Sequence, residues 1–117
     1  MIISICLTAT LCAPQWQTTS SWYSRAECVT RRNPEARTAS GEKLDDNALT
    51  CAHPTLPFGT RLKVSYNGKS IIVRVNDRGP AARLVRQGRG LDLTKGAFAQ
   101  LAPLRLGLIR VTVEKVN

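Results

Sequence analysis

Two segments of alternating polar and apolar residues, joined by Asn67-Gly68, place the strongest constraint on the fold of this chain. Residues 61–66 alternate with a period of two, and residues 70–75 do so again with Ile71, Val73 and Val75 on one face. Both positions of an Asn-Gly pair tolerate positive φ, which a tight two-residue turn requires. The sequence therefore predicts an antiparallel hairpin near the middle of the chain, with a sharp turn after it at residues 76–80.

Other segments predict further short strands and one helix. The strands are expected at residues 21–23, 91–93 and 108–116. Residues 94–101 carry an apolar stripe that predicts a helix, with Thr94 as its N-cap and Pro103 barring its continuation. Residues 25–46 and 81–90 are expected to form loops. Several short strands with one brief helix favour a closed β-barrel, because closure removes exposed strand edges.

The length of 117 residues allows one domain, and 43% hydrophobic residues with a mean hydropathy of -0.15 fit a soluble globular chain. Residues 1–13 are apolar, uncharged and too short to span a bilayer, which is typical of the hydrophobic part of a secretory signal peptide. We assign residues 1–19 to this leader and a loose polar segment, and residues 20–117 to the folded domain. Leu11 is a poor residue before a lipidated cysteine, so lipid anchoring through Cys12 is not expected.

Cys28 and Cys51 remain once such a leader is removed. An even pair in a small exported domain predicts one disulfide, and the alternative is two buried free thiols. A zinc site is poorly supported, because Cys28, Cys51 and His53 have no standard spacing and the chain has no second histidine.

Seventeen Lys and Arg residues against eight Asp and Glu give a net charge of +9. A field of this size favours polyanionic partners, which could be nucleic acid, anionic lipid or an acidic cell-wall polymer. The chain has no signature of a nucleic-acid-binding module and few aromatic residues free to stack on bases, so nucleic acid is not an expected partner. The charge is interpreted as general attraction to an anionic matrix, with a merely solvated basic surface as the alternative.

Four segments in a fixed order resemble one family. They are residues 21–23 (SWY), 37–42 (RTASGE), 47–60 (NALTCAHPTLPFGT) and 73–80 (VRVNDRGP). Together they resemble the barrel domain of the rare lipoprotein A family, the septal-ring lytic transglycosylases. The resemblance implies a mainly β fold, a six-stranded double-psi β-barrel with one or two short helices. It also implies cleavage of peptidoglycan glycan strands to 1,6-anhydro-muramyl ends, with preference for strands stripped of stem peptides.

On this reading the protein is exported to the periplasm or cell envelope, is a monomer, needs no cofactor or metal, and is not inserted in the membrane after the leader is removed. Its partner is the peptidoglycan glycan strand. The alternative is a non-catalytic, expansin-like or barwin-like module that binds cell-wall polysaccharide.

The family's functional residues correspond to Glu42, His53 and Asp77. Asp77 is our candidate general acid, and the alternative is that it caps the turn before Gly79-Pro80. His53 is given a substrate-orienting or proton-handling role, against that of a structural hydrogen-bonding residue. Glu42 is given a site role, against that of a solvated loop carboxylate. The candidate substrate-binding residues are Tyr23, Asn76, Arg78 and Asp92.

A lytic transglycosylase uses the muramyl 6-hydroxyl as an internal nucleophile, so one well-placed acid suffices where hydrolysis needs two carboxylates. An acid that works near neutral pH needs a raised pKa. Arg74 and Arg78 would lower the pKa of Asp77, and neighbouring carboxylates such as Glu42 or Asp92 would raise it. The sequence leaves this balance open.

Overall fold

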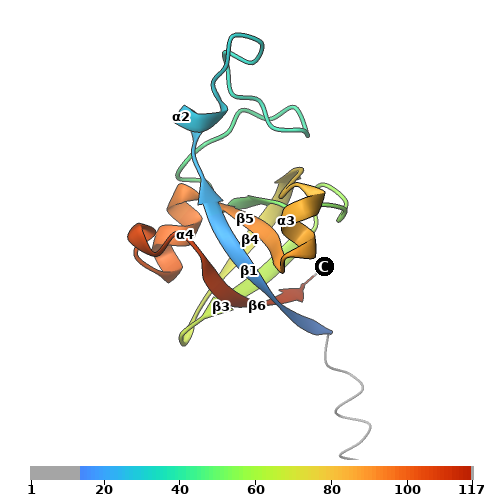
Figure 1. Ribbon diagram of the computed structural model, residues 1–117, viewed down its shortest axis with the longest axis vertical. Helices are drawn as coiled ribbons and strands as arrows, with labels where there is room; N and C mark the ends of the chain where they lie inside the picture. The colour runs from blue at the N-terminus through green and yellow to red at the C-terminus, as the bar shows by residue number, and fades with distance from the viewer. Residues whose placement is uncertain (1–13, 117) are drawn as a thin grey trace, which may run out of the picture.

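The computed structural model describes residues 14–116, and the predicted leader at residues 1–13 lies outside them. Six strands close into a barrel in the order β1-β5-β2-β4-β3-β6 (Figure 1). The strands are β1 Gln15–Tyr23, β2 Thr50–Ala52, β3 Arg61–Tyr66, β4 Lys69–Asp77, β5 Arg89–Thr94 and β6 Ile109–Lys115. The helices are α2 Arg25–Cys28, α3 Ala82–Arg86, α4 Lys95–Leu101 and the 3-10 turn η1 Leu104–Leu106. The predicted mainly β, six-stranded barrel is confirmed.

The hairpin predicted from Asn67-Gly68 is confirmed. β3 and β4 pair antiparallel from Tyr66↔Lys69 to Arg61↔Arg74. Asn67 and Gly68 have φ of 49° and 82°, the left-handed values that a tight hairpin turn of this kind requires. Leu62, Val64 and Val73 point into the barrel and are almost fully buried, as the alternation predicts.

The short strand β2 links two parts of the barrel. It runs parallel to β4 and antiparallel to β5, and Ala52 lies opposite Asp77 on one side and Asp92 on the other. β1 forms the second parallel pair, with β5. The end of β2 therefore lies between the ends of two strands that carry acidic side chains.

The core is mainly aliphatic, with Phe98 of α4 as its largest fully buried side chain. The predicted helix begins after Thr94, whose Oγ1 accepts a hydrogen bond from Ala97 N at 3.3 Å. The same hydroxyl donates to Ala48 O at 2.7 Å, which ties the start of α4 to the loop before β2. Within residues 14–116, no helix has the length and apolar character needed to cross a membrane.

The polar segment before residue 20 belongs to the barrel, contrary to the prediction of a loose segment. β1 pairs with β6 from Gln15↔Glu114 to Ser20↔Ile109. Its buried side chains include Thr18, Ser20 and Ser21, which are small and polar, so the strand lacks the apolar alternation that reveals β3 and β4. Thr18 Oγ1 donates to Gly88 O at 3.1 Å and accepts from Gly90 N at 2.9 Å, which satisfies this hydroxyl inside the structure.

Four short elements were not predicted, namely α2, α3, β2 and η1. α2 and α3 have four and five residues and bury none of them, so neither carries an apolar stripe. β2 has three residues, which is too short for an alternating pattern to be recognised.

The predicted disulfide is absent, because Cys28 and Cys51 are both free thiols. Cys51 lies opposite Val75 and Leu93 in the sheet and is fully buried in the core with them. Cys28 is half-buried at the end of α2, which lies beyond the end of the barrel (Figure 1). The two thiols therefore differ in burial, although both lie near Tyr23.

Serine substitution tests this arrangement. We expect Cys51→Ser to lower the free energy of unfolding by roughly 1–3 kcal/mol, because a hydroxyl replaces a thiol in an apolar core. Cys28→Ser should change it by less than about 0.5 kcal/mol. Urea unfolding of the two variants measures the difference. Equal losses in both, with no thiol detected in the unfolded wild type, would instead indicate a disulfide.

Candidate active site at the ends of β2 and β4

The loop at residues 37–42 folds over the end of β4 and forms one wall of the candidate site. Arg37 and Lys43 pair across the base of this loop, and Gly41 reverses its direction at a φ of 95°. Ser40 N donates to Asn76 O at 3.2 Å. The loop thus reaches the strand end that carries Asp77.

Backbone N–H groups fix one carboxylate oxygen of Asp77. Its Oδ1 accepts hydrogen bonds from Ala39 N at 2.8 Å and from Arg78 N at 2.9 Å. Its backbone oxygen accepts from His53 N at 3.2 Å, which joins the end of β4 to the segment after β2. Among the described residues, no backbone N–H group and no charged side chain donates to Oδ2, and the Tyr23 hydroxyl lies near the same carboxylate.

Tyr23 lies beside Asp77 with its hydroxyl buried. Burial is the main cause that raises the pKa of the Tyr23 phenol, and the negative charge of Asp77 raises it further. The Tyr23 hydroxyl lies within hydrogen-bonding reach of the Asp77 carboxylate, which also raises the pKa of Tyr23, although its angles are not those of a formed hydrogen bond. Tyr23 is therefore a neutral group that faces the candidate acid from inside the protein.

His53 is held in one tautomer by the turn that follows it. Its Nδ1 accepts hydrogen bonds from Thr55 N at 3.1 Å and Leu56 N at 3.0 Å. Burial lowers the pKa of His53, and the positive charge of Arg78 lowers it further. The ring is thus neutral near pH 7 and carries its hydrogen on Nε2, which suits it to orient a substrate oxygen as a hydrogen-bond donor.

Glu42 is fully engaged within the protein. It accepts from Arg74 Nη1 at 2.7 Å and Nη2 at 2.9 Å, and from Asn76 Nδ2 at 3.1 Å. Hydrogen bonds from Arg74 and then Asn76 lower the pKa of Glu42 to about 2. Glu42 is therefore ionised near neutral pH and clamps the loop at residues 37–42 onto β4. Asn76 is 2% exposed, so it lies beneath this clamp.

Asp92 is held by a different arginine. Arg89 Nη2 donates to Asp92 Oδ1 at 3.3 Å and to Ser21 Oγ at 2.6 Å, and Ser21 Oγ contacts the same carboxylate oxygen. This group ties β5 to β1. The other carboxylate oxygen faces Gly79, where a Cβ atom would lie 3.7 Å from Asp92 Oδ2. Asp92 thus borders the turn after Asp77.

Arg78 lies at the exposed edge of the site. Its Nη1 donates to Leu56 O at 2.8 Å and to His53 O at 3.3 Å. Its guanidinium carbon lies 4.1 Å from the centre of the Phe58 ring, a cation–π distance.

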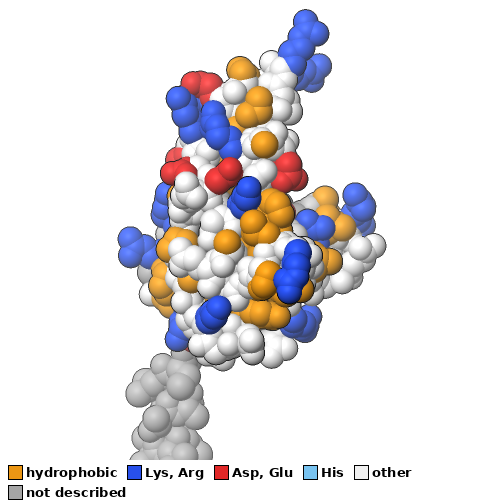
Figure 2. All heavy atoms as spheres, turned by 90° about the vertical axis from the view of Figure 1, so that its left-hand side faces the viewer, with side chains coloured by type: hydrophobic (Ala, Val, Ile, Leu, Met, Phe, Trp, Pro, Cys, Tyr) orange, Lys and Arg blue, Asp and Glu red, His pale blue; other side chains and the backbone are white. Residues whose placement is uncertain are grey.

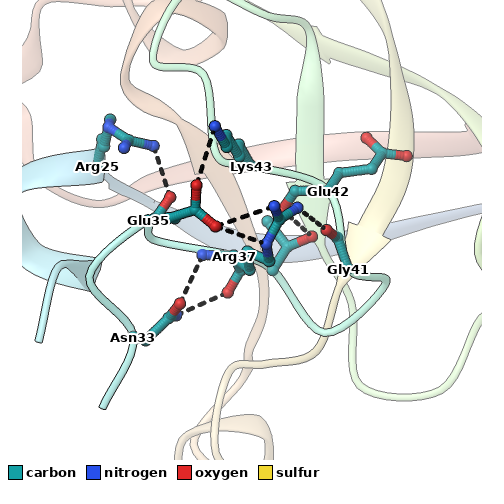
Figure 3. A network of polar contacts seen from close by, with 8 residues as sticks. Arg25, Asn33, Glu35, Arg37, Gly41, Glu42 and Lys43 are labelled. Atoms are coloured by element: carbon teal, nitrogen blue, oxygen red, sulfur yellow. Dashed lines mark hydrogen bonds and ion pairs between the residues drawn. The ribbon is translucent and has the colours of Figure 1, made fainter. Parts of the chain in front are cut away.

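A second polar network supports the loop and was not anticipated from the sequence (Figure 3). Glu35 forms ion pairs with Arg37 at 3.0 Å and Lys43 at 3.1 Å. Asn33 bonds Arg37 in both directions, with Arg37 N donating to Asn33 Oδ1 and Asn33 Nδ2 donating to Arg37 O, each at 2.9 Å. Arg25 Nη1 donates to Glu35 O and Leu44 O. In the sequence, the mixture of acidic and basic residues at 35–43 was the signal that could have indicated this network.

Charge is dispersed over the face seen in Figure 2. Lys and Arg side chains are scattered there, and acidic side chains gather at the upper part, towards the loop before β2. Among residues 14–116, no group of three or more His, Cys, Asp or Glu side chains is arranged to hold a metal ion.

Comparison with known proteins fits this geometry. The family model described as lytic transglycolase matches residues 16–113. The chain belongs to this family. It is 57% identical over 83 residues to the probable endolytic peptidoglycan transglycosylase RlpA of Synechocystis, covering 69% of this chain and 25% of that protein. It is 38% identical over 99 residues to the endolytic peptidoglycan transglycosylase RlpA of Neisseria meningitidis serogroup A, covering 83% of this chain and 37% of that protein.

The chain thus spans about a quarter to a third of the curated lytic transglycosylase relatives it matches. Among solved structures, Streptomyces papain inhibitor matches with a TM-score of 0.67 and 26% identity, over 89% of this chain and 96% of the inhibitor. Clavibacter michiganensis expansin matches with a TM-score of 0.66 and 20% identity, over 89% of this chain and 51% of the expansin, which shows the shared fold alone. The predicted double-psi β-barrel is confirmed.

The clamp role of Glu42 predicts a pH-dependent stability difference. The lowered pKa means that the Glu42 carboxylate stabilises the fold fully above its ordinary pKa of 4.5 and loses this effect as the pH falls to about 2. Near pH 7, the free energy of unfolding of the wild type should exceed that of Glu42→Gln by up to about 1 kcal/mol. The difference is no larger because the Glu42–Arg74 pair is partly exposed and solvent screens it. Urea unfolding between about pH 7 and pH 2 should show this gap closing.

Arg74→Gln provides the matched background for this measurement. The hydrogen bond from Arg74 is the largest cause that lowers the pKa of Glu42. When Arg74→Gln is already present, adding Glu42→Gln should therefore lower the free energy of unfolding by less than it does in the wild type. A gap that stays constant from pH 7 to pH 2 would contradict the clamp.

Proposed function

We propose that this chain is an endolytic lytic transglycosylase that cleaves the MurNAc-GlcNAc glycan strands of peptidoglycan, preferably peptide-poor ones, and leaves 1,6-anhydro-MurNAc ends. Membership of the lytic transglycolase family and the names of the RlpA relatives support this activity. Because peptidoglycan lies outside the cytoplasmic membrane, we place the action of the chain in the cell envelope.

One observation favours this chemistry over ordinary hydrolysis: the site holds a single uncommitted carboxylate. Glu42 is paired with Arg74, and Asp92 is paired with Arg89. Asp77 forms no ion pair among the described residues, and its carboxylate contacts only neutral donors, the N–H groups of Ala39 and Arg78 and the Tyr23 hydroxyl. Hydrolysis by two carboxylates needs a second one to activate water or attack the sugar. Transglycosylation supplies its nucleophile from the substrate, so Asp77 alone is sufficient.

The proposed reaction begins with Asp77 protonated on Oδ2. The proton passes to the departing glycosidic oxygen while the bond from this oxygen to muramyl C1 breaks. The muramyl 6-hydroxyl oxygen attacks C1 and closes the anhydro ring, and its proton returns to Asp77. Between these transfers Asp77 is a carboxylate, and the N–H groups of Ala39 and Arg78 stabilise its charge at Oδ1. His53 Nε2–H orients a sugar oxygen nearby.

Substitution of the acid tests the proposal. Asp77→Asn retains an oxygen for the two backbone N–H groups but has no proton to donate. We expect the rate of anhydro-muropeptide release from peptide-stripped sacculi to fall by about 10²–10⁴-fold, the usual contribution of a general acid. Mass spectrometry of the soluble products measures it. Asp45→Asn, the same change at an exposed loop carboxylate, serves as the matched control and should retain the wild-type rate.

The products also distinguish the other functions. Full activity in Asp77→Asn would show that Asp77 is not the acid. Products with reducing ends would indicate a hydrolase. Retention on sacculi with no released product would indicate the polysaccharide-binding module of expansin or barwin type.

A further inference from the structure

Arg78 is a cation fixed in place at the edge of the candidate site. Two backbone oxygens, Leu56 O and His53 O, accept hydrogen bonds from its Nη1. The Phe58 ring covers one face of the guanidinium at 4.1 Å. The guanidinium group of an exposed arginine is usually mobile, but these contacts hold that of Arg78 in place. Binding a ligand therefore costs this side chain little further conformational entropy.

The opposite edge of the guanidinium is open. Nε and Nη2 of Arg78 donate to no residue within the part of the chain that the structure describes. On this edge two N–H groups point in parallel and match the two oxygens of one carboxylate. Phe58 is 43% exposed and extends the surface beside this edge with an apolar ring.

No acidic side chain of the described chain fills this edge. Glu42 is bound by Arg74, Asp92 by Arg89, and Glu35 by Arg37 and Lys43. Asp77 is reached by the backbone N–H of Arg78, not by its side chain. Arg78 therefore presents a prearranged carboxylate-binding fork for which residues 14–116 supply no partner.

We propose that Arg78 and Phe58 form a subsite for the lactyl carboxylate of a muramyl residue, and that this subsite sets the preference of the enzyme among glycan strands. The inference rests on the proposed function, which brings a muramyl sugar to Asp77. The lactyl group carries a carboxylate when no peptide is attached, and a neutral amide when one is. Arg78 Nη1 donates to His53 O, and His53 N donates to Asp77 O, so the fork lies beside the segment that borders the candidate acid. The fork pairs with the free carboxylate, and the lactyl methyl packs on Phe58.

The test uses peptide-free glycan strands and the same strands with their lactyl carboxyls converted to methylamides. Binding is measured by calorimetry in the Asp77→Asn chain, which does not consume the strands. We expect the carboxylate strands to bind about tenfold more tightly than the amidated ones, as for an exposed charge-assisted pair. Arg78→Gln should remove this difference by weakening binding of the carboxylate strands alone. Arg78→Lys, which keeps the charge without the fork, should retain part of it.

Arg83→Gln removes the same charge from the exposed helix α3 and should keep the full discrimination. Thermal unfolding confirms that each variant is folded. Equal binding of both strands by the Asp77→Asn chain, or discrimination that persists in Arg78→Gln, would overturn the subsite. If the wild-type chain releases anhydro ends at equal rates from both strands, the subsite fails while the proposed function stands. If strands are discriminated but never cleaved, the proposed function fails while the subsite stands.

Discussion

The three residues of β2 are the constraint on which the rest of the molecule depends. β2 is the strand that joins β4 to β5, so the barrel closes through it. Its register places Cys51 in the core and Ala52 between Asp77 and Asp92. The chain leaves β2 at His53, whose backbone N–H bonds Asp77 O. The same short pairing that completes the barrel therefore brings the histidine and the candidate acid together.

The charged side chains of the candidate site differ in whether they already form an ion pair within the protein. The chain has a net charge of +9. Within it, Glu42 forms an ion pair with Arg74, and Asp92 forms one with Arg89. These pairs neutralise Arg74 and Arg89, and they fix the loop at residues 37–42 to β4 and β1 to β5. Asp77 and Arg78 remain as adjacent residues whose side chains form no ion pair among the described residues. The first suits proton transfer and the second suits recognition of an anion.

Much of the barrel could be predicted, because alternation is strong wherever one face of a strand is apolar. β3, β4, β6 and α4 all follow from such patterns. β1 could be predicted only in its last residues, since Thr18, Ser20 and Ser21 bury hydroxyl groups instead of apolar side chains. The predicted disulfide is not found in the structure, where Cys28 and Cys51 are free thiols, and an even pair of cysteines does not by itself specify that two thiols meet in bonding geometry.

The sequence by itself determined the hairpin and the capped helix, because these depend on local pattern, and its ordered motifs, through the family resemblance, predicted Glu42, His53 and Asp77 as site residues. The division of roles among those residues was decided by the tertiary structure. Glu42 became a clamp when Arg74 and Asn76, about thirty residues away, met it across the loop. Tyr23 became a buried neighbour of Asp77, and Arg78 became an open fork. Hydrogen-bond partners and burial arise from contacts between distant segments, and no local pattern in the chain records them.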